Sequence, residues 1–306
     1  MSDTPSNINK SILPPQAIKR LEASKNSHTS SSLLDASAHL SVKLCGFTPV
    51  GEVMGCIVQN IGFTGYAGCG WYGYGVQQFS TTLYDGRNTS YWGGLNPYLS
   101  ALRSGYHTAL LRMQAEAREL GADGVIGVTL KESRFEDGQR EYMAMGTAIT
   151  STGTAHAKTP FMTLLSGNDL AKLIPAGWIP QSILVAISLG IRHDDYYTRM
   201  AASSIGRIPT TSFATYNIEL PGHTDLLNTV RHDVRQQLSR MAKTANADGV
   251  ILSEQVTTEI HEIEVGEQHR DLVGMAMATG NAIARYDAAL EKRNFGNIKK
   301  VINLKK

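Results

Sequence analysis

The sequence contains few of the features that identify a secreted, membrane-spanning or nucleic-acid-binding protein. Charged residues are only 18% of the 306 residues and the formal net charge is +2, so nucleic-acid binding is not expected. Three widely spaced cysteines are too few for a disulfide framework and favour a reducing cytoplasm: Cys45, Cys56 and Cys69. No basic segment followed by an apolar one occurs near the N-terminus, so we expect no secretory signal.

Recognisable catalytic and cofactor motifs are also missing. The string G-x-G-x-x-G at Gly68, Gly70 and Gly73 is followed by strand-like sequence, whereas a dinucleotide site requires a helix directly after it. No nucleophile elbow, phosphate-binding loop or zinc-protease motif occurs. Asp123 and Asp248 follow expected helix ends, where an aspartate more often bonds to nearby backbone than acts in catalysis. We therefore expect no cofactor and no enzymatic activity.

The cysteines are weak candidates for metal ligands. No two of Cys45, Cys56 and Cys69 form the close pair that soft-metal sites usually use. Cys56 lies in an apolar run, where a cysteine behaves as a small buried hydrophobe. Metal binding is therefore an alternative function rather than the expected one.

One uncharged stretch is about as long as a membrane-spanning helix. Residues 173–191 contain no charged side chain. Pro175 and Pro180 near its start, and β-branched residues near its end, indicate a loop that enters a buried strand. We therefore expect a soluble protein.

Two parts of the chain repeat the same order of local signals. In each part a glycine, an aromatic residue and a proline introduce an apolar strand: Gly46, Phe47 and Pro49, then Gly177, Trp178 and Pro180. A helix with apolar residues at three- and four-residue intervals follows each strand. We expect the caps of these helices at Asn96 and Thr224.

The sequence after each helix is the clearest link between the two parts. Ala-Asp-Gly-Val-Ile occurs at residues 122–126 and again at 247–251. Gly121 precedes the first occurrence and Asn246 precedes the second, and both residue types favour the positive φ that ends a helix. We therefore expect Gly121 and Asn246 to be structural caps. A strand, a polar turn and a second strand follow in each part.

These signals predict the α+β fold class, with two tandem β-α-β-β modules, each a small sheet with a helix packed on one face. The predicted organisation is a flexible N-terminal arm over residues 1–41, a first module over 42–155, a second over 161–286 and a basic C-terminal tail over 287–306. One short helix is expected within the arm, after Pro14 and Pro15. The tail is either solvated or in weak contact with an anionic partner or a membrane surface.

Three features of the first module resemble the YbjQ-like family, which is labelled as heavy-metal-binding. They are the strand glycines Gly51 and Gly55 around Val53, the helix end A-R-x-L-G-A-D-G-V-I-G-V at 117–128, and M-G-T-A-I at 145–149. The second module departs from this pattern, with Ser182, Leu184 and Ala186 in the strand and Asn281 in place of Thr147. The resemblance implies a compact module in proteins that form closed homo-oligomeric rings, often pentamers, with no established reaction.

A glycine-rich segment with interleaved aromatic residues separates the first strand from the first helix. The stretch from Val53 to Tyr84 contains no charged residue and is rich in glycine. Its aromatic residues include Phe63, Tyr66, Trp71, Tyr72 and Tyr74. Such a surface packs closely, so we interpret it as an oligomer contact or a lid over a ring opening. The alternative is a loop packed on its own module.

These observations together predict a non-enzymatic structural protein. It is expected to be a homo-oligomer that forms a ring or a larger shell, because two unequal modules can alternate around a ring. The alternatives are a metal-ion binding protein and a module that binds a small molecule or a lipid surface.

Overall fold

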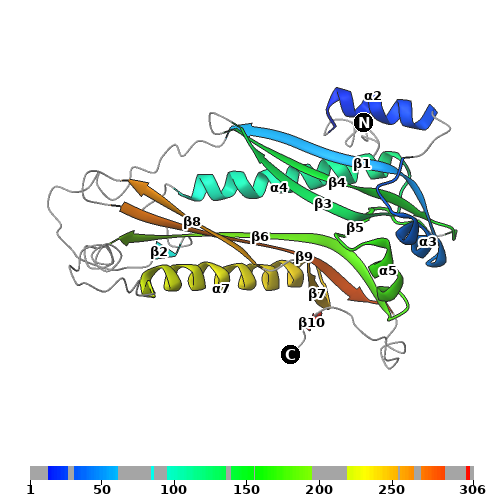
Figure 1. The fold of residues 1–306 in the computed structure, drawn as a ribbon. Coiled ribbons are helices and arrows are strands. Elements are labelled where there is room, and N and C mark those ends of the chain that lie inside the picture. The colour runs from blue at the N-terminus through cyan, green and yellow to red at the C-terminus, as the bar shows by residue number, and fades with distance from the viewer. Residues whose placement is uncertain are drawn as a thin grey trace, which may run out of the picture.

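The computed structural model shows an α+β protein built on two sheets, sheet A and sheet B (Figure 1). It describes residues 13–26, 31–60, 84–85, 95–135, 139–154, 156–194, 219–253, 256–264, 270–286 and 301–303. Within these residues, no helix is long and apolar enough to cross a membrane. The uncharged stretch at 173–191 begins at the end of a short helix and continues into a long strand of sheet B.

Sheet A has the strand order β1-β4-β3-β5. Its strands are β1 (Phe47–Asn60), β3 (Gly124–Arg134), β4 (Gln139–Ser151) and β5 (Phe161–Met162). The long helix α4 (Leu95–Glu119) packs on one face of β1 and β4. A Cβ atom on Gly55 would lie 2.0 Å from the carbonyl oxygen of Ala109, so only glycine allows α4 to approach β1 this closely.

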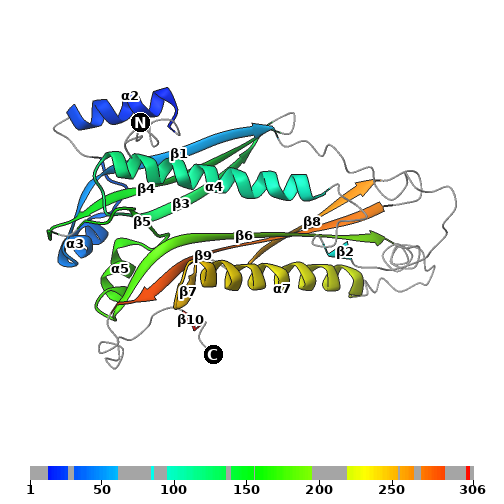
Figure 2. The ribbon, with the colours of Figure 1, turned by 180° about the vertical axis from the view of Figure 1, so that it is seen from behind.

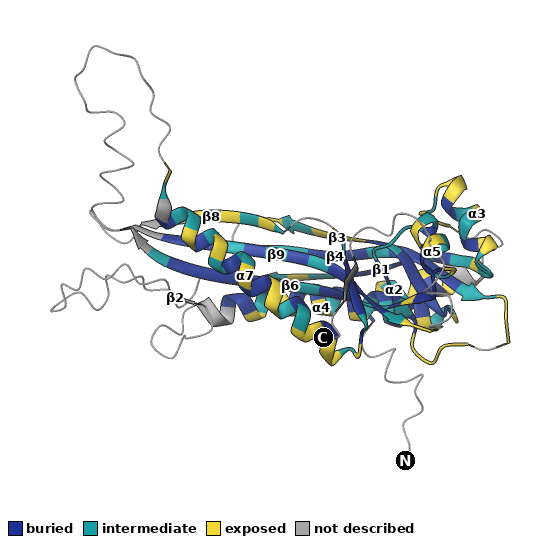
Figure 3. Cartoon of the chain, turned by 90° about the horizontal axis from the view of Figure 1, so that it is seen from below, coloured by how far each residue is buried: buried dark blue, intermediate teal, exposed yellow. Residues whose placement is uncertain are grey.

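Sheet B has the strand order β10-β7-β9-β6-β2, and β8 also pairs with β9. Its strands are β2 (Tyr84–Asp85), β6 (Trp178–Asp194), β7 (Gly249–Leu252), β8 (Thr257–Glu264), β9 (Arg270–Arg285) and β10 (Val301–Asn303). The helix α7 (Pro221–Thr244) packs on β6 and β9. Seen from below, β6 and β9 are buried over most of their length (Figure 3).

Both sheets contain the same local arrangement. In sheet A, β4 pairs antiparallel with β1 and β3, and in sheet B, β9 pairs antiparallel with β6 and with β7 and β8. The register of β1 shifts between Pro49 and Gly51, and that of β6 shifts between Pro180 and Ser182. We refer to the elements from α3 to β4 as the first module and to those from α5 to β9 as the second module.

The turns around these strands also agree between the modules. Gly46 and Gly177 have φ of 79° and 84° directly before β1 and β6. Gly121 and Asn246 have φ of 71° and 52° directly after α4 and α7, so the exchange of glycine for asparagine falls on left-handed backbone. The β7 and β8 strands together occupy the place that the single strand β3 has in sheet A.

A short helix precedes the first strand of each module. Helix α3 (Ala36–Leu44) begins after Asp35, whose carboxylate accepts the N–H of Ala38, and α5 (Gly167–Leu173) begins after Ser166, whose hydroxyl accepts the N–H of Asp169. In the views of Figures 1 and 2, α4 runs between β1 and β6. One apolar core accordingly includes side chains of α4, sheet A and sheet B.

The N-terminal segment differs from the flexible arm that the sequence predicted. Helix α2 (Pro15–Asn26) contains the expected short helix, and Arg20 on it pairs with the buried carboxylate of Glu116 on α4 at 2.5 Å. Leu13 and Leu21 are buried against α4. Helix α3 was not predicted, because its packing partner is α5, far away in the sequence.

Two further details correct the sequence-based predictions. Helix α4 begins at Leu95 and helix α7 at Pro221, so Asn96 and Thr224 both lie inside the first turn of their helices rather than at the caps. Part of the predicted basic tail forms strand β10, which pairs with β7. The β-branched pair Val301 and Ile302 favours a strand, and β7 offers an open edge for it. The other tail residues lie outside the described part of the chain.

Candidate assembly interface

The segment before α5 connects the two modules through backbone hydrogen bonds. The N–H of Phe161 donates to the carbonyl oxygen of Asp123 at 3.1 Å, and the N–H of Thr163 donates to that of Val125 at 2.9 Å. The N–H of Val128 donates back to the carbonyl oxygen of Thr163 at 3.1 Å. Strand β5 thus extends sheet A of the first module although it leads directly into the second.

The same segment is also bound by the second module. The side-chain oxygen of Asn281 on β9 accepts a hydrogen bond from the Thr163 hydroxyl at 2.9 Å and one from the N–H of Leu164 at 2.7 Å. Thr163 and Asn281 are completely buried. A buried polar side chain without these partners would destabilise the fold, so the pair fixes how the modules meet.

Helices α3 and α5 form a second contact between the modules. A Cβ atom on Gly167 would lie 2.6 Å from the carbonyl oxygen of Ala38, so the two helices touch backbone to backbone at this point. The side-chain amide of Asn168 accepts from the hydroxyl of Ser41 at 2.7 Å and donates to that of Ser37 at 2.9 Å. The contact therefore has defined polar partners as well as close packing.

A third contact lies between α4 and sheet B. The guanidinium group of Arg103 donates to the carbonyl oxygen of Ile187 at 2.7 Å and to the side chain of Gln237 on α7 at 2.9 Å. Sheet B contributes a row of apolar side chains to the core that surrounds α4: Ile183, Ile187, Leu189, Ile191 and Val273. Sheet B is therefore covered by α7 on one face and by the first module on the other.

The matching face of sheet A is only partly buried. We define this open face of sheet A by the side chains that point away from α4: Met54, Cys56, Val58, Met143 and Met145. Counted from the shared register shift, Val58 corresponds to Leu189. Val58 is 55% exposed, whereas Leu189 is 3% exposed. An apolar face that the second module buries is thus presented to solvent by the first.

Asp123 stabilises the junction between the end of α4 and the chain after β4. Its carboxylate accepts the N–H of Ser151 and of Ala157, each at 2.7 Å, and the hydroxyl of Thr150 at 3.1 Å, and it contacts the His156 ring at 3.0 Å. Desolvation raises the pKa of Asp123, but these hydrogen bonds outweigh it and lower the pKa to about 2.

Asp248 makes the corresponding contact in the second module. Its carboxylate accepts the N–H of Arg285 at 3.0 Å, and its own N–H donates to the carbonyl oxygen of Ile283. Asp123 likewise donates its N–H to the carbonyl oxygen of Ile149. The repeated aspartate is therefore a backbone anchor in both modules, as the sequence predicted.

A buried polar cluster links α4 to β3 and β4. Glu132 accepts the Tyr106 hydroxyl at 3.1 Å and the Arg140 guanidinium at 2.6 Å, and Arg140 also bonds to the Tyr98 hydroxyl. The rings of Tyr106 and Tyr142 meet edge to face with centroids 4.8 Å apart. Desolvation raises the pKa of both phenols, so both remain protonated at neutral pH.

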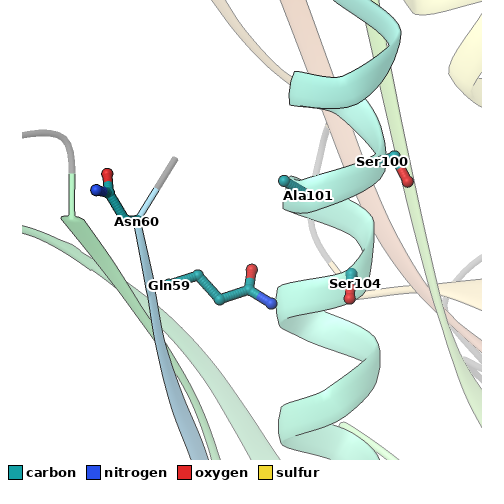
Figure 4. A pocket seen from close by; sticks show the side chains of 5 residues that line it. All are labelled: Gln59, Asn60, Ser100, Ala101 and Ser104. Carbon is teal, nitrogen blue, oxygen red and sulfur yellow. The ribbon is translucent and has the colours of Figure 1, made fainter. Parts of the chain in front are cut away.

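A shallow hollow lies where the end of β1 meets the start of α4. Its lining residues are Gln59, Asn60, Ser100, Ala101 and Ser104. The Gln59 side chain points toward α4 (Figure 4). These lining side chains provide amide and hydroxyl groups, which bind polar ligands through hydrogen bonds but do not titrate near neutral pH.

All five residues predicted for an oligomer contact or lid lie outside the described residues: Phe63, Tyr66, Trp71, Tyr72 and Tyr74. Their role remains a prediction. The end of that segment is described as β2, and it pairs with β6 at Ile191 and Gly190. The segment therefore ends on sheet B rather than on its own module.

The predicted cysteine ligands are not brought together with other ligands in the described part of the chain. Cys45 follows α3, and burial raises the pKa of its thiol. Cys56 lies on the open face of sheet A, and its carbonyl oxygen accepts the Arg112 guanidinium at 2.6 Å. Among the described residues, no group of three or more His, Cys, Asp or Glu side chains is placed to hold a metal ion. Cys69 lies outside them.

Sequence reasoning missed the junction formed by Thr163 and Asn281. The usable signal was the repeat of Leu-Leu before a capping residue, at Leu33-Leu34-Asp35 and Leu164-Leu165-Ser166. This repeat aligns the residues before α3 with those before α5. The comparison of the strands began after these residues and therefore did not include them.

Comparison with known proteins relates part of the chain to the YbjQ-like family, which the first module resembles in sequence. Residues 77–152 match the family described as "Putative heavy-metal-binding", with the family name YbjQ_1. The chain is 31% identical over 185 residues to the "Encapsulin nanocompartment protein Rv1762c" of Mycobacterium tuberculosis, which covers 58% of this chain and 62% of that protein.

Shorter similarities connect the chain to UPF0145 proteins. One from Natronomonas pharaonis is 44% identical over 57 residues, covering 19% of this chain and 55% of that protein. One from Thermotoga maritima is 40% identical over 57 residues, covering 19% and 54%. The chain thus spans between about half and 62% of the length of these relatives.

Proposed function

We propose that this protein is a non-enzymatic structural protein that assembles with further copies of itself into a ring or a larger shell. Its building blocks are two tandem YbjQ-like modules, of which the second is a diverged copy of the first. Three matched features of the described elements support the duplication. The pair of β1 with β4 matches that of β6 with β9, their register shifts match, and so do the aspartate anchors.

The observation that carries the proposal is the difference between the two matched sheet faces. The second module buries its face against the first, whereas the open face of sheet A exposes the apolar side chain of Val58. A contiguous apolar surface on a monomer commonly marks a contact with another protein. A second copy that repeats the internal contact of this chain would cover it.

The nature of one relative supports the same conclusion. The Mycobacterium tuberculosis protein with 31% identity is named as an encapsulin nanocompartment protein, which favours a role of this chain in a multi-subunit assembly. A contact between unlike surfaces of identical copies closes into a ring when its rotation allows closure. The contact between the two modules of one chain likewise joins two different surfaces.

The substitution Val58→Asp tests the proposal. A charge on the open face of sheet A should prevent association, because burying an unpaired carboxylate is costly. Val58→Thr is the matched control, since it retains the β-branched shape without a charge. Sedimentation velocity at micromolar concentrations should show assemblies for the wild-type protein and Val58→Thr, and smaller species for Val58→Asp. If Val58→Asp assembles like the wild-type protein, this face is not the contact.

A further inference from the structure

The segment before α3 is held in the same way as the segment before α5. The N–H of Leu33 donates to the hydroxyl of Thr147 at 3.1 Å, as the N–H of Leu164 donates to Asn281 at 2.7 Å. Thr147 and Asn281 occupy matched positions, opposite Glu52 on β1 and Ile183 on β6. Each module therefore binds the chain just before its own short helix.

A local turn strengthens the match between the two segments. The Ser32 hydroxyl accepts the N–H of Leu34 at 3.2 Å, and the Thr163 hydroxyl accepts the N–H of Leu165 at 3.2 Å. Both turns lead into a helix with a side-chain cap. Ser32 therefore has the same conformational role as Thr163, with a hydroxyl group in the same place.

The two segments differ in what lies on their outer side. Thr163 is completely buried because β3 of the first module covers it, and Met162 is 8% exposed. Ser31 and Ser32 are exposed, and Leu33 is 50% exposed. The segment before α3 thus repeats the hydrogen bonds of the segment before α5, but within the described residues no strand pairs with its outer side.

The strand that matches β3 is β7, and its edge is taken by β10. Val301 lies opposite Ile251, and Asn303 lies opposite Gly249, in an antiparallel pair of three residues. In the first module the same edge binds β5 in parallel orientation, at Gly124. One edge of a strand pairs with one strand at a time, so β10 occupies the place of a β5-like segment.

We propose that copies of this chain join head to tail by strand exchange, in which the segment that contains Ser31 and Ser32 of one copy replaces β10 on β7 of the next. This proposal rests on the proposed assembly function and specifies the contact between neighbouring copies. The added strand pairs in parallel with β7, as β5 pairs with β3 inside one chain. Its N–H groups bond to backbone carbonyl oxygens, so a serine-rich segment serves as well as an apolar one.

Strand exchange also gives β10 a defined role. A free strand edge is a template for unwanted pairing, and a short strand of the same chain protects it until a second copy arrives. Because β10 pairs over only three residues, its displacement breaks few hydrogen bonds. Residues from the end of the chain therefore compete with a neighbouring copy for one edge.

The substitution Ser32→Pro tests the incoming strand. The N–H of Ser32 corresponds to that of Thr163, which bonds to Val125, and proline removes this donor. Ser32→Ala is the matched control because it keeps the N–H. In a dilution series followed by sedimentation velocity, Ser32→Pro should raise the concentration at half-assembly by about tenfold or more, and Ser32→Ala should behave as the wild-type protein. Equal curves for Ser32→Pro and Ser32→Ala would overturn the proposal.

The double substitution Val301→Pro with Ile302→Pro tests the displaced strand. Adjacent residues of a strand direct their N–H groups to opposite edges, so one of the two prolines removes a bond to β7. Assembly should then occur at a concentration about tenfold lower than for the matched Val301→Ala, Ile302→Ala protein. A concentration that is unchanged or higher would contradict exchange at this edge.

These outcomes separate the joint from the assembly itself. A wild-type protein that assembles while Ser32→Pro has no effect leaves the proposed function in place and removes only the strand exchange. If the wild-type protein and all of these variants are monomeric, the proposed function is refuted as well. The melting temperatures of Ser32→Pro and Ser32→Ala should remain near that of the wild-type protein, since Ser32 is exposed.

Discussion

The side-chain oxygen of Asn281 accepts a hydrogen bond from the hydroxyl of Thr163 at 2.9 Å, and both side chains are fully buried. Thr163 belongs to the segment that extends sheet A, and Asn281 belongs to the central strand of sheet B. One polar contact therefore ties the two sheets together at the point where the chain passes from one module to the other.

Replacement of Asn281 should destabilise the whole chain. Asn281→Leu leaves the Thr163 hydroxyl and the Leu164 N–H buried without an acceptor, which should lower the free energy of unfolding by about 1–3 kcal/mol. Asn281→Thr copies the residue at the matched position, Thr147, and should cost less. Urea unfolding followed by circular dichroism measures both, and an equal loss for the two variants would contradict this account of the contact.

Asp123 should make stability depend on acid pH. Its pKa is about 2 in the folded chain and near 3.8 in an unfolded one, so the unfolded chain binds more protons in this range. The contribution is fully present above about pH 4, is lost as the pH falls toward about 2, and is on the order of 2 kcal/mol.

Unfolding free energies measured across the acid range would test this contribution. Asp123→Asn should reduce stability near neutral pH and should flatten the pH dependence between those limits. An unchanged slope in the variant would show that other groups cause the acid sensitivity.

At the ends of α4 and α7, glycine and alanine should have opposite effects on stability. Gly121→Ala should cost about 1 kcal/mol or slightly more, because its φ is 71° and no atom lies near the added Cβ, so the cost is purely conformational. Asn246→Gly should leave stability unchanged or raise it slightly, whereas Asn246→Ala should lower it. Thermal unfolding ranks the three variants, and stabilisation by either alanine would be inconsistent with left-handed caps.

The elements with strong local patterns were accessible from the sequence. The apolar stripes of α4 and α7 and the turn glycines before β1 and β6 are properties of short stretches of chain. The α+β class followed from their order. The exchange of Gly121 for Asn246 indicated where two helices end because each residue type tolerates positive φ.

The contacts between modules were not accessible in the same way. Strand β5 has two residues and exists because β3 offers an edge, so no alternation reveals it. Helix α3 is short, and isolated helices of that length are marginal without a packing partner. Asn281 looked like a departure from the family pattern, but its amide serves a segment more than a hundred residues away in the sequence.

The mass of the purified wild-type particle tests the central claim most directly. Native mass spectrometry at micromolar concentration should show a discrete species at a whole-number multiple of the 33.2 kDa chain mass, as expected for a closed assembly of identical copies. A single species at 33.2 kDa across the whole concentration range would contradict the proposal that this protein assembles with itself.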